Sequence, residues 1–238
     1  MNRSKAPEGA ANVATAVAQS VQYQGRKASR HGSEQRRQLI LDAAMRIVVR
    51  EGVRGVRHRA VAALADVPLS ATTYYFKDID DLLHDTFAQY VERSAAFMAK
   101  LWQSTELKLR ELVARSDGSL DSRGQLADEI AHMAAHYVEH QLLTRREQLL
   151  AEQAFHQAAL LNPRLAPLVR AHEQIFLQGC CQIFQVLGSK QPQQDANVLT
   201  AIIGRMEYHG LLDGAQPLAD HDRLAIVTRY MHLVLAAL

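Results

Sequence analysis

Apolar residues recur at intervals of three and four residues from about residue 33 almost to the end of the chain, and this spacing constrains the fold most strongly. Such a period is typical of amphipathic helices, whereas half-buried strands alternate with a period of two. No segment alternates over a useful length. The sequence therefore predicts an all-α fold. The first apolar face is formed by Leu39, Ile40, Ala43, Ala44, Ile47 and Val48.

The helical period is interrupted where glycine, proline and short polar residues cluster, and these positions predict the helix boundaries. Gly52 should end the first helix, while Ser70 and Asp78 are good N-caps for the third and fourth. About nine helices are expected, over approximately 33–51, 58–65, 71–76, 78–114, 123–141, 144–161, 164–187, 194–212 and 221–237.

Composition excludes several classes of protein. The two cysteines, Cys180 and Cys181, are adjacent, which excludes a disulfide scaffold and a four-cysteine zinc site. No apolar run approaches the roughly 20 residues that cross a bilayer. The first 20 residues contain no Leu, Ile or Phe and make a poor secretory signal. We therefore expect a cytoplasmic protein without a membrane segment.

Charge is concentrated at the N-terminal end. Residues 1–59 contain twelve Lys and Arg against four Asp and Glu, a net of +8, although the whole chain has a net charge of only +2. This distribution predicts that one end of the protein binds a polyanion. Residues 1–32 are expected to form a disordered basic arm. Two hypotheses remain for the basic cluster at 26–31: additional phosphate contacts, or an unstructured leader without a role.

A helix, a short helix, a tight turn and a second short helix follow one another over residues 33–77, which is typical of a helix-turn-helix. The last helix must be slim to enter the major groove, about 12 Å wide, and residues 70–74 are small or carry hydroxyl groups. Basic residues on either side can hold phosphates. Tyr75 and Phe76 are expected in the core. The predicted DNA-binding residues are Arg57, His58, Arg59, Leu69, Ser70, Thr72, Thr73, Tyr74 and Lys77.

Residues 36–85 resemble the DNA-binding domain of the TetR family of transcriptional repressors. The matching features are Ala43-Ala44, Gly52, the segments 57–62 and 65–67, Thr73-Tyr74-Tyr75-Phe76 and Leu82-Leu83. Two positions depart from the family pattern. Asp66 replaces the usual glycine of the turn, but Asp tolerates a left-handed backbone better than most residues. Thr73 stands where the family usually has a tyrosine.

This resemblance implies a helix-turn-helix domain at 33–79 and a helical ligand-binding and dimerisation domain at 80–238. It also implies a homodimer whose two recognition helices bind a palindromic double-stranded DNA operator. A small-molecule effector would tilt the fourth helix and release the DNA. The helices at about 164–187 and 194–212 would pair across the dimer axis, with Gly179 and Gly204 allowing close approach. No enzymatic activity and no cofactor are expected.

An effector pocket should be mostly apolar with a few polar groups. The same residues can equally form ordinary core, and the sequence does not distinguish the two roles. The candidates for ligand binding are Phe97, Met98, Trp102, Met133, His136, Tyr137, Phe155, His156, Phe176, Met206 and His209.

His132, His136 and His140 lie four residues apart on one helical face, which raises an alternative function. His132 and His136 can share a metal ion with an acid such as Glu152, as in a helical metal-dependent enzyme or a metal sensor. The three histidines span about 12 Å along a helix, so they cannot all bind one ion. Solvated or ligand-contacting histidines are the simpler interpretation, and no metal is predicted. The adjacent cysteines are interpreted as buried core thiols.

Overall fold

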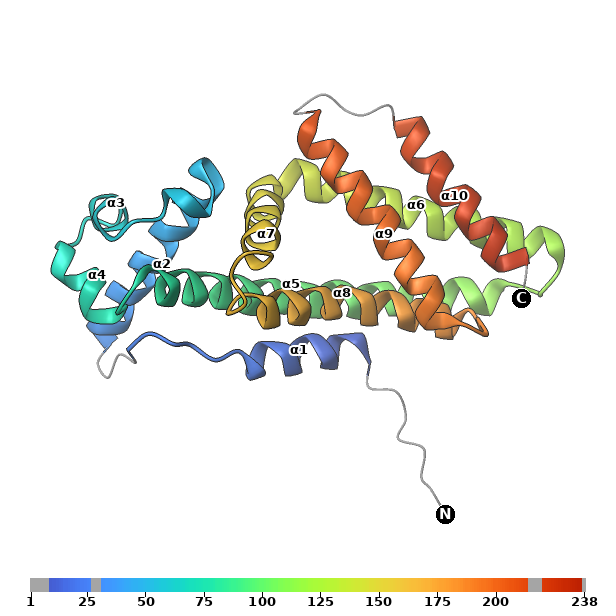
Figure 1. The fold of residues 1–238 in the computed structure, drawn as a ribbon. Helices are drawn as coiled ribbons and strands as arrows, with labels where there is room; N and C mark the ends of the chain where they lie inside the picture. The colour runs from blue at the N-terminus through green and yellow to red at the C-terminus, as the bar shows by residue number, and fades with distance from the viewer. Residues whose placement is uncertain (1–8, 27–30, 214–219, 237–238) are drawn as a thin grey trace, which may run out of the picture. The chain divides into compact units, whose positions relative to one another are not determined.

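The computed structural model describes residues 9–26, 31–213 and 220–236, and in these ranges it contains helices and no strands (Figure 1). The all-α fold is therefore confirmed. The α-helices are α1 (Ala10–Ser20), α2 (His31–Glu51), α3 (His58–Leu64), α4 (Leu69–Tyr75), α5 (Ile79–Arg115), α6 (Leu120–Thr144), α7 (Arg146–Ala159), α8 (Ala166–Val186), α9 (Pro192–Leu212) and α10 (Asp220–Ala236).

Helix α1 was not predicted, and the expectation of disorder is wrong for residues 10–20. This segment contains five alanines, the strongest helix former, and it buries Ala10 and Ala14. Residues 21–26 follow without helical structure but make specific hydrogen bonds, described below. Residues 1–8 and 27–30, which belong to the same predicted arm, lie outside the described residues.

Most of the predicted helix ends are confirmed to within a few residues. Gly52 follows the end of α2 with φ of 72°, a conformation that glycine adopts without strain. Asp78 caps α5, since its carboxylate accepts a hydrogen bond of 2.8 Å from the Asp81 amide. Ser70 does not cap α4. The helix begins at Leu69, two residues before the predicted start, and Pro68 with its extended backbone takes the N-cap position.

The chain forms two compact units, and α1, α5, α7 and α8 each contribute to both. The first unit contains the N-terminal residues up to Ala16, together with 96–149 and 173–238. The second contains 17–95 and 150–172. The helix-turn-helix therefore shares a compact unit with the first part of α5 and with most of α7, beyond the predicted boundary at residue 79. In this second unit the Phe87 and Phe155 rings stack at 4.2 Å.

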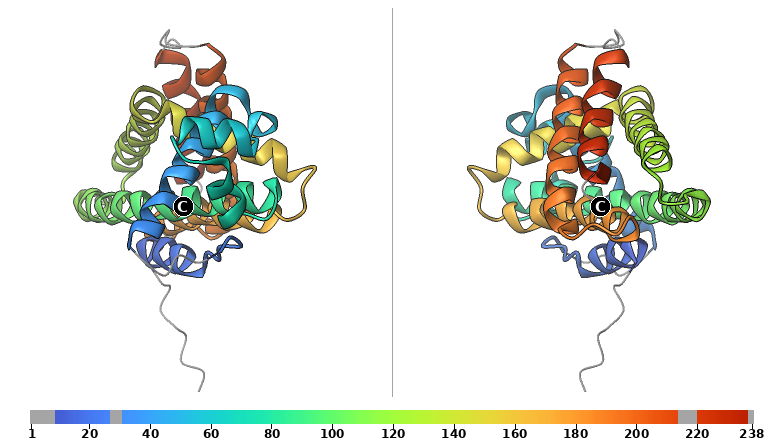
Figure 2. Two further views of the ribbon diagram at one scale, coloured as in Figure 1. Left: turned by 90° about the vertical axis from the view of Figure 1, so that its left-hand side faces the viewer. Right: turned by 90° about the vertical axis from the view of Figure 1, so that its right-hand side faces the viewer.

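In the first unit, α9 and α10 lie side by side and both pack against α6, as two views show (Figures 1 and 2). Gly179 of α8 lies against the indole ring of Trp102, which leaves no room for a Cβ atom. Gly179 thus allows α8 to approach the Trp102 side chain of α5 closely within the chain, whereas the approach expected across a dimer axis stays a prediction. Among the described residues, no helix is long and apolar enough to span a bilayer.

Candidate nucleic-acid interface and ligand cavity

The turn between α3 and α4 is a Schellman motif. The Val67 amide donates to the Ala62 carbonyl at 3.0 Å, and the Asp66 amide donates to the Ala63 carbonyl at 3.4 Å. Asp66 has φ of 52° and supplies the left-handed residue that this motif requires. The prediction that an aspartate can replace the turn glycine here is confirmed. The turn joins α3 to α4, and the two helices pack against each other.

Helix α4 has one exposed face and one buried face. Leu69, Ser70, Thr73 and Tyr74 form the exposed face, and Tyr74 retains 53% of its accessible surface. Tyr75 and Phe76 are buried, as predicted for core residues. We call the four exposed residues the outer face of α4.

Thr72 does not belong to this face, and its prediction as a DNA-binding residue is wrong. The side chain is fully buried, with 0% exposure, and its hydroxyl donates a hydrogen bond of 2.8 Å to the Leu69 carbonyl. The hydroxyl therefore satisfies the first turn of the helix instead of facing solvent.

Three further exposed cations lie in the same compact unit as the outer face of α4. Arg57, at the N-cap of α3, Arg59 and Lys77 are all exposed. His58 is half-buried, and its Nδ1 has no hydrogen-bond partner among the described residues. Arginine and lysine at such positions can neutralise phosphates on either side of a groove.

Arg26 is an additional cation that was considered only as part of a basic tail. Its guanidinium lies 4.3 Å from the centre of the Tyr74 ring, and its amide donates to the Tyr75 carbonyl at 2.8 Å. The segment 21–26 is thus attached to the C-terminal end of α4. Sequence spacing could not reveal this contact, because nearly 50 residues separate the two partners.

Asp85, near the start of α5, attaches the same segment to the rest of the unit. Its buried carboxylate accepts hydrogen bonds from the amides of Gln24 (2.6 Å) and Gly25 (2.9 Å). Arg37 of α2 donates a further bond of 2.6 Å, and His84 lies 3.3 Å away. Burial raises the pKa of Asp85, but these hydrogen bonds outweigh burial and hold it below its ordinary value of 3.8.

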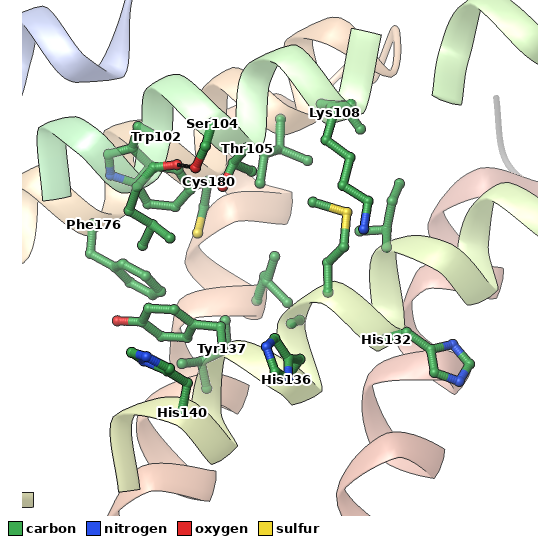
Figure 3. A pocket seen from close by; sticks show the side chains of 18 of the residues that line it. Trp102, Ser104, Thr105, Lys108, His132, His136, Tyr137, His140, Phe176 and Cys180 are labelled. Atoms are coloured by element: carbon green, nitrogen blue, oxygen red, sulfur yellow. Dashed lines mark hydrogen bonds between the residues drawn. The ribbon is translucent and has the colours of Figure 1, made fainter. Parts of the chain in front are cut away.

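The first unit contains a cavity of about 740 Å³ between α5, α6, α8 and α9 (Figure 3). This volume suits a small organic ligand. Its wall is mostly apolar and aromatic: the Phe176 ring lies 5.6 Å from Trp102 and 5.4 Å from Tyr137. Six of the predicted ligand-binding residues line the cavity, namely Phe97, Trp102, Met133, His136, Tyr137 and Phe176.

The other five candidates do not line this cavity. Phe155 and His156 belong to the second unit, where Phe155 packs on Phe87. Met98 and Met206 are buried elsewhere in their helices, and His209 is half-exposed near the end of α9. The helical period of the sequence identifies these side chains as inward-facing or polar. It does not show whether an inward-facing side chain lines the cavity or packs in the core.

Basic side chains lie around the apolar wall of the cavity. Lys100, Lys108, His132 and His140 contribute to its lining, and Glu129 is an acidic member. In Figure 3, Lys108 extends from α5 toward α6. The sequence had not singled out the two lysines, because exposed lysines on a helix usually indicate only solvation.

The contacts of the α6 histidines do not support the metal site that was raised as an alternative. His132 contacts the Asp128 carbonyl at 2.7 Å, and His136 lies 3.7 Å from the Glu139 carboxylate. Glu152, the acid suggested as a shared ligand, belongs to the other compact unit. Cys180 and Cys181 are free and buried, as expected, and burial raises the pKa of both thiols.

The faces expected to form a dimer are only partly exposed. On α8, Ile175 and Phe184 are buried in the chain's own core, so these two side chains are not exposed to a second copy. Helices α9 and α10 instead expose large apolar residues, and no atom lies within 4 Å of the Cβ position at Gly204. The exposed apolar residues on these two helices, here called the α9–α10 face, are Val198, Tyr208, Leu212, Ile226 and Leu233.

Comparisons with known proteins agree with this architecture. The HTH-type transcriptional regulator BetI of Burkholderia ambifaria is 27% identical over 207 residues, which cover 86% of this chain and 96% of the relative. BetI of Paraburkholderia xenovorans is 27% identical over 205 residues, or 86% of this chain and 95% of the relative. No protein-family model matches the chain.

Solved structures show the same fold. A member of the TetR family from Streptomyces coelicolor has a TM-score of 0.53 and 27% identity, covering 82% of this chain and 98% of its own. A transcriptional regulator from Rhodococcus has a TM-score of 0.57 and 16% identity, covering 84% and 96%.

Fold, turn and relatives together define a helix-turn-helix transcriptional regulator. More specifically, the chain is similar to TetR-family regulators in both sequence and fold, and the resemblance stated from residues 36–85 is confirmed. Its relatives are regulators and not enzymes, in agreement with the prediction that this chain has no enzymatic activity.

Proposed function

We propose that the chain is a homodimeric, ligand-responsive repressor in the cytoplasm, which binds a palindromic operator and releases it when an effector occupies the cavity. The observation that carries this proposal is the outer face of α4. It is exposed and slim, the Arg26 guanidinium lies beside its Tyr74 ring, and further exposed arginines lie in the same unit, which suits entry into a major groove.

The proposed DNA contacts divide into two groups. Ser70, Thr73 and Tyr74 carry hydroxyl groups that can bond base edges, and exposed Leu69 can contact thymine methyl groups. Phosphate contacts come from the surrounding cations and fix the position of α4. We assign this second role to Arg26, Arg57, His58, Arg59 and Lys77.

The effector is proposed to be a small aromatic or amphipathic molecule that fills the cavity of the first unit. Apolar rings supply its binding surface, and Lys100, Lys108 and the α6 histidines supply polar contacts. Helix α5 carries both Asp85, in the unit with the DNA-binding helices, and Trp102, in the cavity wall. Release requires that the effector bind the DNA-incompetent conformation more tightly than the DNA-competent one.

Dimerisation is proposed to occur through the α9–α10 face. Five large apolar side chains exposed on two adjacent helices form a surface that a second copy can cover. Two such pairs would make a four-helix bundle across a two-fold axis.

Selection of bound duplexes from random DNA tests the proposal. We expect an inverted repeat with half-sites about 34–36 Å apart, centre to centre, and an affinity that falls steeply as salt increases. Recovery of no common sequence, together with salt-insensitive binding, would contradict operator recognition. The gene's own upstream region is a second target for the same measurement.

A further inference from the structure

Three potential metal ligands converge in the unit that contains the helix-turn-helix. Glu152 and His156 are four residues apart on α7, so they project from one face of that helix. His172 approaches from α8. Each of the three side chains offers one ligand atom, and these three atoms all lie within 4.8 Å of one another. Glu152 Oε1 is 3.9 Å from His156 Nε2 and 3.8 Å from His172 Nδ1.

These distances fit ligands around one ion better than a directly bonded pair. Hydrogen-bonded nitrogen and oxygen atoms stand about 2.7–3.2 Å apart. Two ligands on a tetrahedral zinc ion, each about 2.1 Å from the metal, stand about 3.4 Å apart. The carboxylate therefore approaches both imidazoles without bonding either, and small side-chain rotations would bring all three atoms to coordination distance.

Helix α5 orients two of the three ligands. The Tyr90 hydroxyl donates to Glu152 Oε2 at 3.0 Å, which leaves Oε1 facing the histidines. Ser94 Oγ shares a hydrogen bond of 2.8 Å with His172 Nε2, so Nδ1 is the nitrogen directed at Glu152. Outer contacts of this kind hold the ligands of metal sites in their binding orientation.

His156 supplies an independent indication of a missing ligand. Its Nε2 atom is buried and has no hydrogen-bond partner among the residues that the structure describes. A buried polar atom ordinarily has a partner, and an ion between the three side chains would provide one. Glu152 and His156 keep about a quarter of their side-chain surface exposed, at 23% and 27%, so an ion can reach the site.

We propose that Glu152, His156 and His172 bind one divalent transition-metal ion of the zinc class. Two imidazoles and one carboxylate are a donor set that suits zinc and does not suit the oxygen-seeking ions magnesium and calcium. Water can complete the coordination. The site is distinct from the histidine pair on α6 and does not depend on the proposed operator binding.

Zinc titration of the untagged, metal-free, full-length protein tests the site, with a chromophoric chelator as competitor. We expect one tightly bound ion per chain. His156→Gln and Glu152→Gln should each weaken binding at least tenfold, and Tyr90→Phe by about tenfold through the lost orienting contact. The control is the double variant His132→Gln, His136→Gln, which should bind zinc as the unaltered protein does.

Two results would overturn the proposal: unchanged zinc affinity in folded His156→Gln protein, or loss of the ion only in the α6 double variant. X-ray absorption of the zinc-loaded unaltered protein needs no variant. We expect the zinc ion to be coordinated by two imidazole nitrogens and by oxygen ligands. A coordination shell that contains no imidazole would refute the site. Operator affinity is measured separately, so failure here leaves the proposed function untouched.

Discussion

Adjacent threonines on α4 have different roles because a helix turns by about 100° for each residue. Thr72 faces the core and donates to the Leu69 carbonyl, while Thr73 faces solvent beside Tyr74. Local sequence makes both residues equally good candidates for DNA contact. Because Thr72 is buried and Thr73 is exposed, only the Thr73 hydroxyl is available for the proposed contact with DNA.

Replacing the recognition side chains should weaken DNA binding without disturbing the fold. Thr73→Ala and Tyr74→Ala are each expected to lower operator affinity by about 1–3 kcal/mol, because each removes a base or phosphate contact. Fluorescence anisotropy with the selected duplex measures the loss. Tyr74→Phe separates the contribution of the hydroxyl from that of the ring. A shift to monomer in size-exclusion chromatography would show that these residues act on assembly instead.

The buried Asp85 carboxylate should make stability depend on acid pH. Its pKa is lowered in the folded state, so its stabilising contribution is complete above about pH 4 and is lost as pH falls through the folded pKa. Asp85→Asn leaves Arg37 as a buried charge without its carboxylate and should cost about 3 kcal/mol at neutral pH. Chemical unfolding at neutral and acid pH measures both effects. If Asp85→Asn lowered the free energy of unfolding equally at pH 7 and at pH 2, this role of the carboxylate would be contradicted.

The turn between α3 and α4 is the element that fixes the orientation of the recognition helix. Its one left-handed residue is an aspartate, and the left-handed region is strained for any residue with a Cβ atom. The Schellman hydrogen bonds compensate for this strain by satisfying the last carbonyls of α3.

Substitutions at Asp66 should therefore change stability through the backbone. Asp66→Gly is expected to raise the free energy of unfolding by about 0.5–1 kcal/mol, since glycine adopts φ of 52° without strain. Asp66→Val should lower it by more than that, because β-branching makes this conformation worse. Urea denaturation checks both. Equal stability of the glycine and valine variants would rule out a backbone origin.

At the scale of the whole molecule, the proposed function depends on bringing two copies of α4 to one operator. The apolar surface available for this is the α9–α10 face, since the apolar side of α8 is used within the chain. The effector cavity lies in the same compact unit as that face.

A charge on the α9–α10 face should separate the subunits. Val198→Glu or Leu233→Glu is expected to produce a monomer with at least tenfold weaker operator binding, because burying an unpaired carboxylate opposes association. Analytical ultracentrifugation measures the mass. Leu160→Glu, on an exposed leucine of the second unit, is the matched control and should remain dimeric. A dimer in all three variants would place the interface elsewhere.

Structural properties that depend on residues close together in the sequence could be predicted from the sequence alone. The period of three to four residues predicted the all-α fold, and Gly52, Asp66 and Asp78 marked their turns and caps through backbone preferences of their own. The helix-turn-helix could be recognised because its chemistry lies within one short stretch.

Properties that depend on contacts between distant residues were decided only by the tertiary structure. These include the burial of Thr72, the attachment of Arg26 to α4, and the choice of cavity-lining side chains. The convergence of Glu152, His156 and His172 is of the same kind. The helical period of a sequence predicts which side of a helix is apolar, but only packing determines what that side contacts. Packing brings together residues that are far apart in the chain, and their spacing in the sequence does not indicate that they meet.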